Sequence, residues 1–81
     1  MSVLVTGGYG HIGSWVCQQL VERGHHVLAL DRSKRNLSYL RDRDSEISHI
    51  PIDVLDQAGL YRTFLENKDS IDGVIHVAGL I

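Results

Sequence analysis

The sequence predicts an α/β fold in which a parallel sheet of four strands is covered by helices on both faces. Short, almost continuously apolar runs, typical of parallel strands buried on both faces, alternate with segments of helical periodicity. A glycine-rich turn joins the first apolar run to the first helical segment. The 81 residues are expected to form one small domain with a limited core.

The first half of the chain predicts a strand, a helix and a second strand. Residues 2–6 are almost continuously apolar and run into glycines, as a buried strand before a tight turn does. Gly24 is expected to end the helix that follows. Residues 26–31 repeat the strand pattern and end in the carboxylate of Asp31. The apolar stripe that faces the sheet is expected to hold Ile12, Trp15, Val16 and Leu20.

The second half predicts two further strands and a second helix. Charged residues dominate 32–44, where a short helix is expected, and 47–52 predict a strand that Pro51 places at a sheet edge. Asp56 is expected to cap the next helix, and residues 73–79 predict the fourth strand. Right-handed crossovers then give a doubly wound sheet of strand order 3-2-1-4. The apolar residues of the second helix are Leu60, Tyr61, Phe64 and Leu65.

The turn after the first strand carries the spacing of a dinucleotide fingerprint, Gly8-x-Gly10-x-x-Gly13, overlapped by Thr6-Gly7-x-x-Gly10-x-x-Gly13. Glycines at this spacing permit a tight turn, let the backbone approach a pyrophosphate and bring the helix close to the strand. Free N–H groups at the helix start suit a diphosphate. The alternative is that the glycines form only a tight strand-to-helix turn.

Asp31 strengthens the nucleotide interpretation. It lies at the end of the second strand, near the offset of about 20 residues at which an acidic side chain binds an adenosine ribose. Its carboxylate would repel a 2′-phosphate, so NAD is favoured over NADP, although Arg32, Lys34 and Arg35 leave room for some tolerance. The prediction is a truncated Rossmann fold that binds NAD.

The sequence resembles the extended short-chain dehydrogenase/reductase family over its whole length, and within that family the N-terminal part of UDP-glucose 4-epimerases. The opening run is Val5-Thr6-Gly7-Gly8-Tyr9-Gly10-His11-Ile12-Gly13-Ser14. Three later blocks agree with the family in kind and spacing: Leu30-Asp31, Asp53-Val54, and residues 74–80.

The resemblance implies a cofactor site. Tyr9, His11 and Ile12 would lie along the pyrophosphate, with Ile12 contributing its backbone N–H. Asp53 would accept from the adenine amino group, unless it is a helix cap or a loop carboxylate, and Val54 would offer its N–H to the ring. The full expected set is Gly7, Gly10, His11, Ile12, Gly13, Asp31, Asp53, Val54, Ala78 and Gly79.

The resemblance also implies chemistry that these residues lack. Family members oxidise a sugar at C4 with a Tyr-x-x-x-Lys pair and a Ser or Thr, passing hydride to NAD and back. The residues four positions after the three tyrosines are Gly13, Arg43 and Leu65. No catalytic residue is therefore expected, and residues 1–81 are interpreted as an NAD-binding half domain without its second nucleotide half or substrate domain, inactive on its own.

Composition limits the classes of partner that the chain is expected to bind. A net charge of −2 without a basic run gives no footprint for nucleic acid, and no apolar stretch approaches the roughly 20 residues needed to cross a membrane. The single Cys17 is interpreted as core packing in a reducing, cytoplasmic setting. His25, His26 and His49 give no metal-site pattern, and His76 is interpreted as a core residue.

The fourth strand suggests how the chain associates. As an apolar edge without a neighbour it is a pairing liability, so we expect a homodimer through the strand from Val74 to Ala78. Two other interpretations remain open at this point. One is a structural or interaction module that dimerises through this edge, with a vestigial turn. The other is one piece of a split nucleotide-sugar epimerase.

Overall fold

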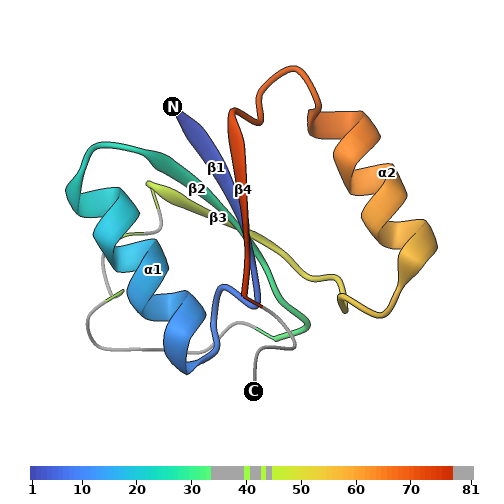
Figure 1. Cartoon of the computed structure of the whole chain (residues 1–81), viewed down its shortest axis with the longest axis horizontal. Coiled ribbons are helices and arrows are strands. Elements are labelled where there is room, and N and C mark those ends of the chain that lie inside the picture. Colours follow the sequence, from blue (N-terminus) through green and yellow to red (C-terminus); the bar gives the residue numbers. More distant parts are fainter. Residues whose placement is uncertain (34–39, 41–42, 44, 78–81) are drawn as a thin grey trace.

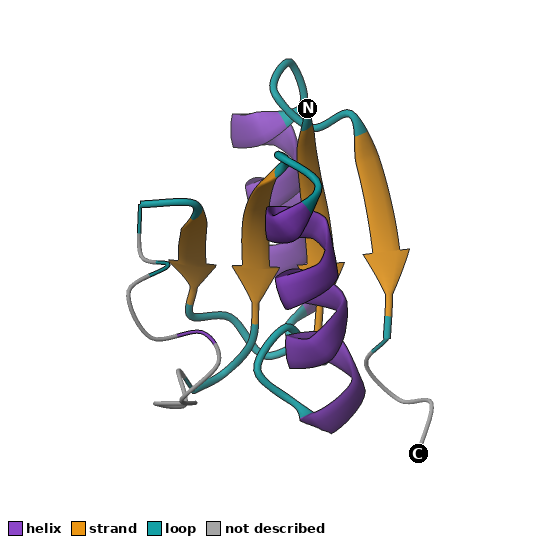
Figure 2. Cartoon of the chain, turned by 90° about the vertical axis from the view of Figure 1, so that its left-hand side faces the viewer, coloured by secondary structure: helices purple, strands orange, loops and turns teal. Residues whose placement is uncertain are grey.

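The computed structural model describes residues 1–33, 40, 43 and 45–77. Four strands form one parallel sheet of order β3-β2-β1-β4, and two helices lie on its opposite sides (Figure 1). Figure 2 shows the strands running in the same direction, with a helix in front of the sheet. The predicted fold class and strand order are confirmed. The elements are β1 (Ser2–Thr6), α1 (His11–Glu22), β2 (His26–Leu30), β3 (Ile47–Ile50), α2 (Gln57–Asn67) and β4 (Gly73–His76).

The core is divided between the two faces of the sheet. On the face that α1 covers, Val5 of β1 lies beside Ala29 of β2, and both are fully buried. On the other face, Leu4 lies beside Leu28 and packs in a second cluster. Because β1 and β2 are the central strands, every second residue enters one cluster and the residues between enter the other. This arrangement explains their continuous apolar runs.

Helix α1 approaches the sheet through small side chains, which corrects the predicted stripe. Ile12 and Trp15 are 55% and 58% exposed, while Val16 and Leu20 pack only partly against the core. The small residues allow a close approach to the sheet, and the largest apolar side chains therefore lie on the flank of the helix. The buried residues of α1 are Gly13, Ser14, Cys17 and Val21.

The end of α1 and its cysteine agree with prediction. Gly24 has a φ of +85° and its N–H donates to the Val21 carbonyl at 2.9 Å, so a left-handed glycine ends the helix. Cys17 is fully buried, and its Sγ lies 3.5 Å from the Gly8 carbonyl oxygen. Burial, with a smaller effect from the negative charge of Asp31, raises the pKa of this thiol to about 12. Cys17 is thus a neutral packing residue at physiological pH.

The strands at the two sheet edges are shorter than predicted. β3 ends at Ile50, because the chain turns at Pro51 and the Ile52 N–H donates to the Ile50 carbonyl instead of continuing the ladder with β2. β4 ends at His76, and Val77 is described but lies outside the strand; residues 78 and 79 of the prediction lie outside the described residues. The short helix predicted within 32–44 also falls largely outside them.

Helix α2 begins as predicted and contacts the core through few of its apolar residues. The Asp56 side chain caps it by accepting from the Gly59 N–H at 3.0 Å. Leu60 packs against the second cluster, whereas Tyr61 and Leu65 are 68% and 51% exposed. The buried residues of α2 are Gly59 and Thr63, so most of the apolar side chains named for this helix lie outside the core. In the part of the chain that the structure describes, neither helix has the length and hydropathy needed to cross a bilayer.

Replacing Asp56 with alanine is expected to lower the free energy of unfolding by about 1 kcal/mol, because the Gly59 N–H loses its acceptor. Urea unfolding measured by circular dichroism checks this value. Asp56→Asn, which retains a capping oxygen, is the control and should lose far less. Equal losses in the two variants would contradict the capping role.

Candidate nucleotide-binding site

The glycine turn is closed by hydrogen bonds between the ends of β1 and β2. Gly7, at a φ of +69°, donates its N–H to the Leu30 carbonyl at 2.8 Å. The Gly7 carbonyl in turn accepts from the Gly10 N–H at 3.0 Å. The left-handed conformation at Gly7 favours glycine, because a β-carbon there is strained.

Two further glycines permit close backbone approach. A β-carbon at Gly8 would lie 2.8 Å from the Ala29 β-carbon, which is closer than real side chains pack. A β-carbon at Gly13 would overlap the carbonyl oxygen of Gly7. The start of α1 therefore rests directly on the turn, and Gly13 is the residue that allows this contact.

The start of α1 is left open for an anion. Gly10 is the N-cap and supplies no side-chain cap, and the first turn holds no acidic residue. The first helical N–H to find an acceptor on the turn is that of Ser14, which donates to the Gly10 carbonyl at 2.9 Å. The preceding N–H groups, from His11 to Gly13, lie at the positive end of the helix dipole. Such an arrangement suits a phosphate.

A cavity of about 380 Å³ lies at the carboxyl ends of the strands and collects four of the predicted site residues. Gly7 contributes from the turn, Asp31 from the end of β2, and Asp53 and Val54 from the segment that follows β3. The remaining lining residues are Leu30, Arg32 and Leu55. Ligands of open α/β sheets bind at this end of the strands, next to the point where the strand order reverses.

The carboxylate of Asp31 is oriented by backbone donors. Its Oδ2 accepts from the Tyr9 N–H at 3.0 Å, and its Oδ1 lies at a longer 3.5 Å from the Ser33 nitrogen. The side chain is half-buried at the cavity wall. Oδ1 is therefore the oxygen better able to accept from a ligand hydroxyl.

Asp53 makes a hydrogen bond within its own loop and also lines the cavity. Its Oδ1 accepts from the Leu55 N–H at 2.9 Å, and its Oδ2 lies 3.8 Å from Arg32 Nη1. The helix cap of α2 is Asp56, so the helix-cap alternative for Asp53 is wrong, whereas the loop contact is real. Because the Arg32 side chain is 77% exposed, this ion pair is solvated and weak.

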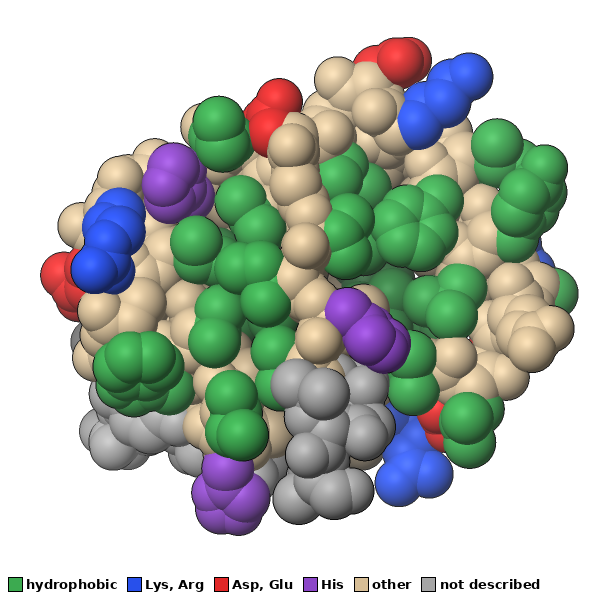
Figure 3. Space-filling model, in the orientation of Figure 1, with side chains coloured by type: hydrophobic (Ala, Val, Ile, Leu, Met, Phe, Trp, Pro, Cys, Tyr) green, Lys and Arg blue, Asp and Glu red, His purple; other side chains and the backbone are tan. Residues whose placement is uncertain are grey.

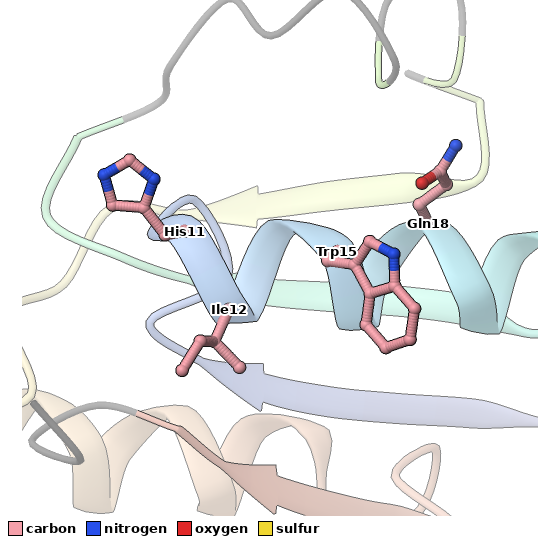
Figure 4. A pocket seen from close by; sticks show the side chains of 4 residues that line it. All are labelled: His11, Ile12, Trp15 and Gln18. Carbon is pink, nitrogen blue, oxygen red and sulfur yellow. The ribbon is translucent and has the colours of Figure 1, made fainter.

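His11 and Ile12 line a second hollow, of about 490 Å³, along the exposed flank of α1. Figure 4 shows their side chains pointing to different sides of the first turn, with Trp15 and Gln18 further along the helix. The structure thus places these two side chains outside the cavity that holds Asp31. Their backbone N–H groups belong to the helix start, which Gly13 joins to the turn.

Three residues differ from expectation or were missed. The Tyr9 side chain, expected along the pyrophosphate, is buried at 3% exposure, and its ring meets His49 edge-on. His49 was considered only as a metal ligand, without support, and the sequence did not indicate that its Nε2 lies 2.9 Å from the Asp31 carbonyl oxygen. His76, expected in the core, is exposed on the edge strand, with Nδ1 2.7 Å from Thr6 Oγ1. Ala78 and Gly79 lie outside the described residues.

A parallel sheet of order β3-β2-β1-β4 with a glycine turn after β1 defines a Rossmann-type α/β protein. The model of the "NAD dependent epimerase/dehydratase family" matches residues 3–81. The chain therefore belongs to this family, and the predictions of family and of NAD as the family's cofactor are confirmed.

Curated relatives cover nearly all of this chain. The UDP-glucose 4-epimerase of Klebsiella pneumoniae is 42% identical over 85 residues, which are 99% of this chain and 60% of that relative. The UDP-glucose 4-epimerase of Bacillus subtilis is 36% identical over 85 residues, and the chain covers 24% of its length. The chain thus spans less than two thirds of either relative.

Solved structures agree in fold. The UDP-glucose 4-epimerase of Bifidobacterium longum, in complex with NAD+ and UDP, superposes with a TM-score of 0.79 at 33% identity, covering 99% of this chain and 25% of that one. The enzyme of Thermotoga maritima, solved with UDP-glucose, gives a TM-score of 0.76 at 29% identity, with coverages of 99% and 25%.

Proposed function

We propose that this chain binds the adenosine diphosphate part of NAD. One observation carries the proposal: Gly7, Asp31, Asp53 and Val54, which are distant in the sequence, line a single cavity at the carboxyl edge of the sheet. The uncapped start of α1 is joined to this cavity by the packing of Gly13 on the turn. The site thus offers polar groups for a nucleoside and an anion-binding helix end for its phosphates.

Each group has a proposed role. The diphosphate lies against the N–H groups of the first turn of α1, including those of His11 and Ile12. Gly10 and Gly13 have no side chains that would block access to the backbone there. Asp31 accepts from the ribose hydroxyls through Oδ1, and a 2′-phosphate is disfavoured there by charge repulsion. Asp53 and Val54 bind the adenine edge, with Ala78 and Gly79 on the same adenosine side.

Isothermal titration calorimetry with NAD, ADP-ribose and NADP tests the proposal. NAD and ADP-ribose are expected to bind with similar affinity, because the contacts are to the shared half, and NADP is expected to bind more weakly. Absence of heat from NAD at millimolar concentration would reject the proposal. Equal affinity for NAD and NADP would reject the role of Asp31.

We further propose that the chain is the N-terminal NAD-binding half domain of a UDP-glucose 4-epimerase and has no turnover alone. Support comes from the epimerase relatives and from the absence of Tyr-x-x-x-Lys within these 81 residues. An epimerase assay on the 81 residues alone should give no product. The same assay after mixing with the C-terminal part of a relative examines whether a separate chain can restore activity. The lone buried Cys17 accords with a cytoplasmic location.

Homodimerisation through β4 is a second proposal. Among the described residues β4 pairs only with β1, and Val74 and Ile75, on opposite faces of the sheet, are 49% and 36% exposed. Figure 3 shows hydrophobic side chains gathered on the face where β4 lies nearest the viewer. A two-fold axis would pair this edge with its copy and cover these side chains.

Replacing Val74 with lysine is expected to convert the dimer to a monomer, since a charge on an edge strand opposes pairing with a second copy. Light scattering across a concentration series measures the mass. The matched control is Tyr61→Lys on the exposed side of α2, which should leave the dimer intact. A wild-type chain that is monomeric at all concentrations would contradict the proposal.

A further inference from the structure

We propose that His49 is a positioning residue for the nucleotide site, one that fixes the main chain of Asp31 so that its carboxylate faces the cavity. The inference rests on the proposed function of that cavity. It gives Asp31, the proposed ribose contact, a supporting residue on β3, a strand whose own residues do not line the cavity.

The hydrogen bond of His49 has a defined direction. Its Nε2 lies 2.9 Å from the carbonyl oxygen of Asp31. A carbonyl oxygen only accepts, so Nε2 carries the proton and donates it. The imidazole is therefore held as the Nε2–H tautomer, or as the imidazolium, which also donates.

The imidazole replaces a missing bond of the parallel ladder. The Asp31 N–H donates to the Ile50 carbonyl at 3.1 Å, as the ladder between β2 and β3 requires. In a regular parallel ladder the next bond would run from the Ile52 N–H to the Asp31 carbonyl. Ile52 donates instead to the Ile50 carbonyl at 2.9 Å, because the chain turns at Pro51. The His49 side chain therefore donates the hydrogen bond to the Asp31 carbonyl that the Ile52 N–H does not make.

A second contact joins the same histidine to the glycine turn. The rings of Tyr9 and His49 meet edge-on, with centroids 5.2 Å apart and planes at 86°. Tyr9 is buried at 3% exposure, and its N–H donates to Asp31 Oδ2 at 3.0 Å. Asp31 is thus held at its carbonyl by His49 and at its carboxylate by Tyr9, while the two rings hold each other. This closed set of contacts links β3, the end of β2 and the turn.

The local packing leaves space for this arrangement. His49 lies beside Ala29 in the β2–β3 register, on the face of the sheet that α1 covers. Ala29 is small, and Gly8 lies directly over it. A larger residue at either position would displace the turn that carries Tyr9.

Substituting His49 tests the inference against a matched control. His49→Phe keeps an aromatic ring against Tyr9 but removes the donor, and about tenfold weaker binding of NAD is expected. His49→Gln restores a side-chain N–H and should recover most of the affinity. The control is His26→Phe, because His26 is a half-buried residue at the opposite end of β2, where its side chain bonds to that of Ser48. It should leave the affinity unchanged.

Two measurements on the nucleotide-free protein separate this inference from the proposed function. A long-range ¹H–¹⁵N spectrum should show a protonated Nε2 at His49. The amide shift of Tyr9 should follow the titration of Asp31 in the wild type and lose this dependence in His49→Phe. If NAD does not bind the wild type, the proposed function fails and these spectra decide the positioning role. Unchanged Tyr9 titration or unchanged NAD affinity in folded His49→Phe would overturn it.

Discussion

Replacing Gly13 with alanine is expected to abolish detectable NAD binding and to lower the free energy of unfolding by about 1–3 kcal/mol. The added β-carbon would overlap the Gly7 carbonyl oxygen and lie 3.2 Å from the Gly8 α-carbon. Both neighbours are backbone, so no side-chain rotation relieves the overlap. The start of α1 must move away from the turn, and the N–H groups that face the diphosphate move with it.

Calorimetry with NAD and urea unfolding measure the two effects of Gly13→Ala. Gly73→Ala is the matched control, because a β-carbon at Gly73 meets nothing within 4 Å and the residue lies at the start of β4. It should bind NAD as the wild type does. Wild-type affinity in Gly13→Ala would show that the close contact between helix and turn is not needed for binding.

Replacing Asp31 with alanine is expected to weaken NAD binding by about 10- to 100-fold, the range for losing hydrogen bonds to a charged group. Discrimination against NADP should also disappear, because the charge that repels a 2′-phosphate is gone. The Tyr9 N–H loses its acceptor in the same variant, so part of the loss reflects a less ordered turn. Titrations with NAD and NADP give both constants.

Asp69→Ala is the charge-matched control for this variant. Asp69 is exposed beyond the end of α2, so its loss changes the net charge equally without touching the cavity. Similar weakening in both variants would mean that Asp31 acts through long-range charge alone. Retained preference for NAD in Asp31→Ala would remove it from the ribose contact.

The fold could be predicted from sequence where the physical signal is local. Central strands such as β1 are buried on both faces, and this alone gives their continuous apolar runs. Gly24 and Asp56 act within one helical turn of their partners, so the end of α1 and the start of α2 were predictable. The buried face of α1 was not, because close packing through Gly13 and Cys17 outweighs the preference of large apolar residues for the interior.

The candidate site likewise contains some residues that could be predicted from the sequence and others that could not. The glycine spacing and the position of Asp31 gave the turn and one carboxylate, and the family resemblance added Asp53 and Val54; the structure brings these to one cavity. The contacts of His49 could not be predicted, since they depend on the register between β2 and β3 and on the turn of the chain at Pro51. The inward direction of the Tyr9 ring likewise depends on neighbours far along the sequence.

The central claim, that the cavity between the glycine turn and the segment after β3 binds the adenosine diphosphate of NAD, is tested most directly by NMR. Amide shifts are followed during titration with ADP-ribose. The account predicts concentrated changes at the first turn of α1 and at Asp31, Asp53 and Val54, with little change along the exposed side of α2. Saturable changes confined to α2 or to the outer edge of β4, or none at millimolar ligand, would contradict it.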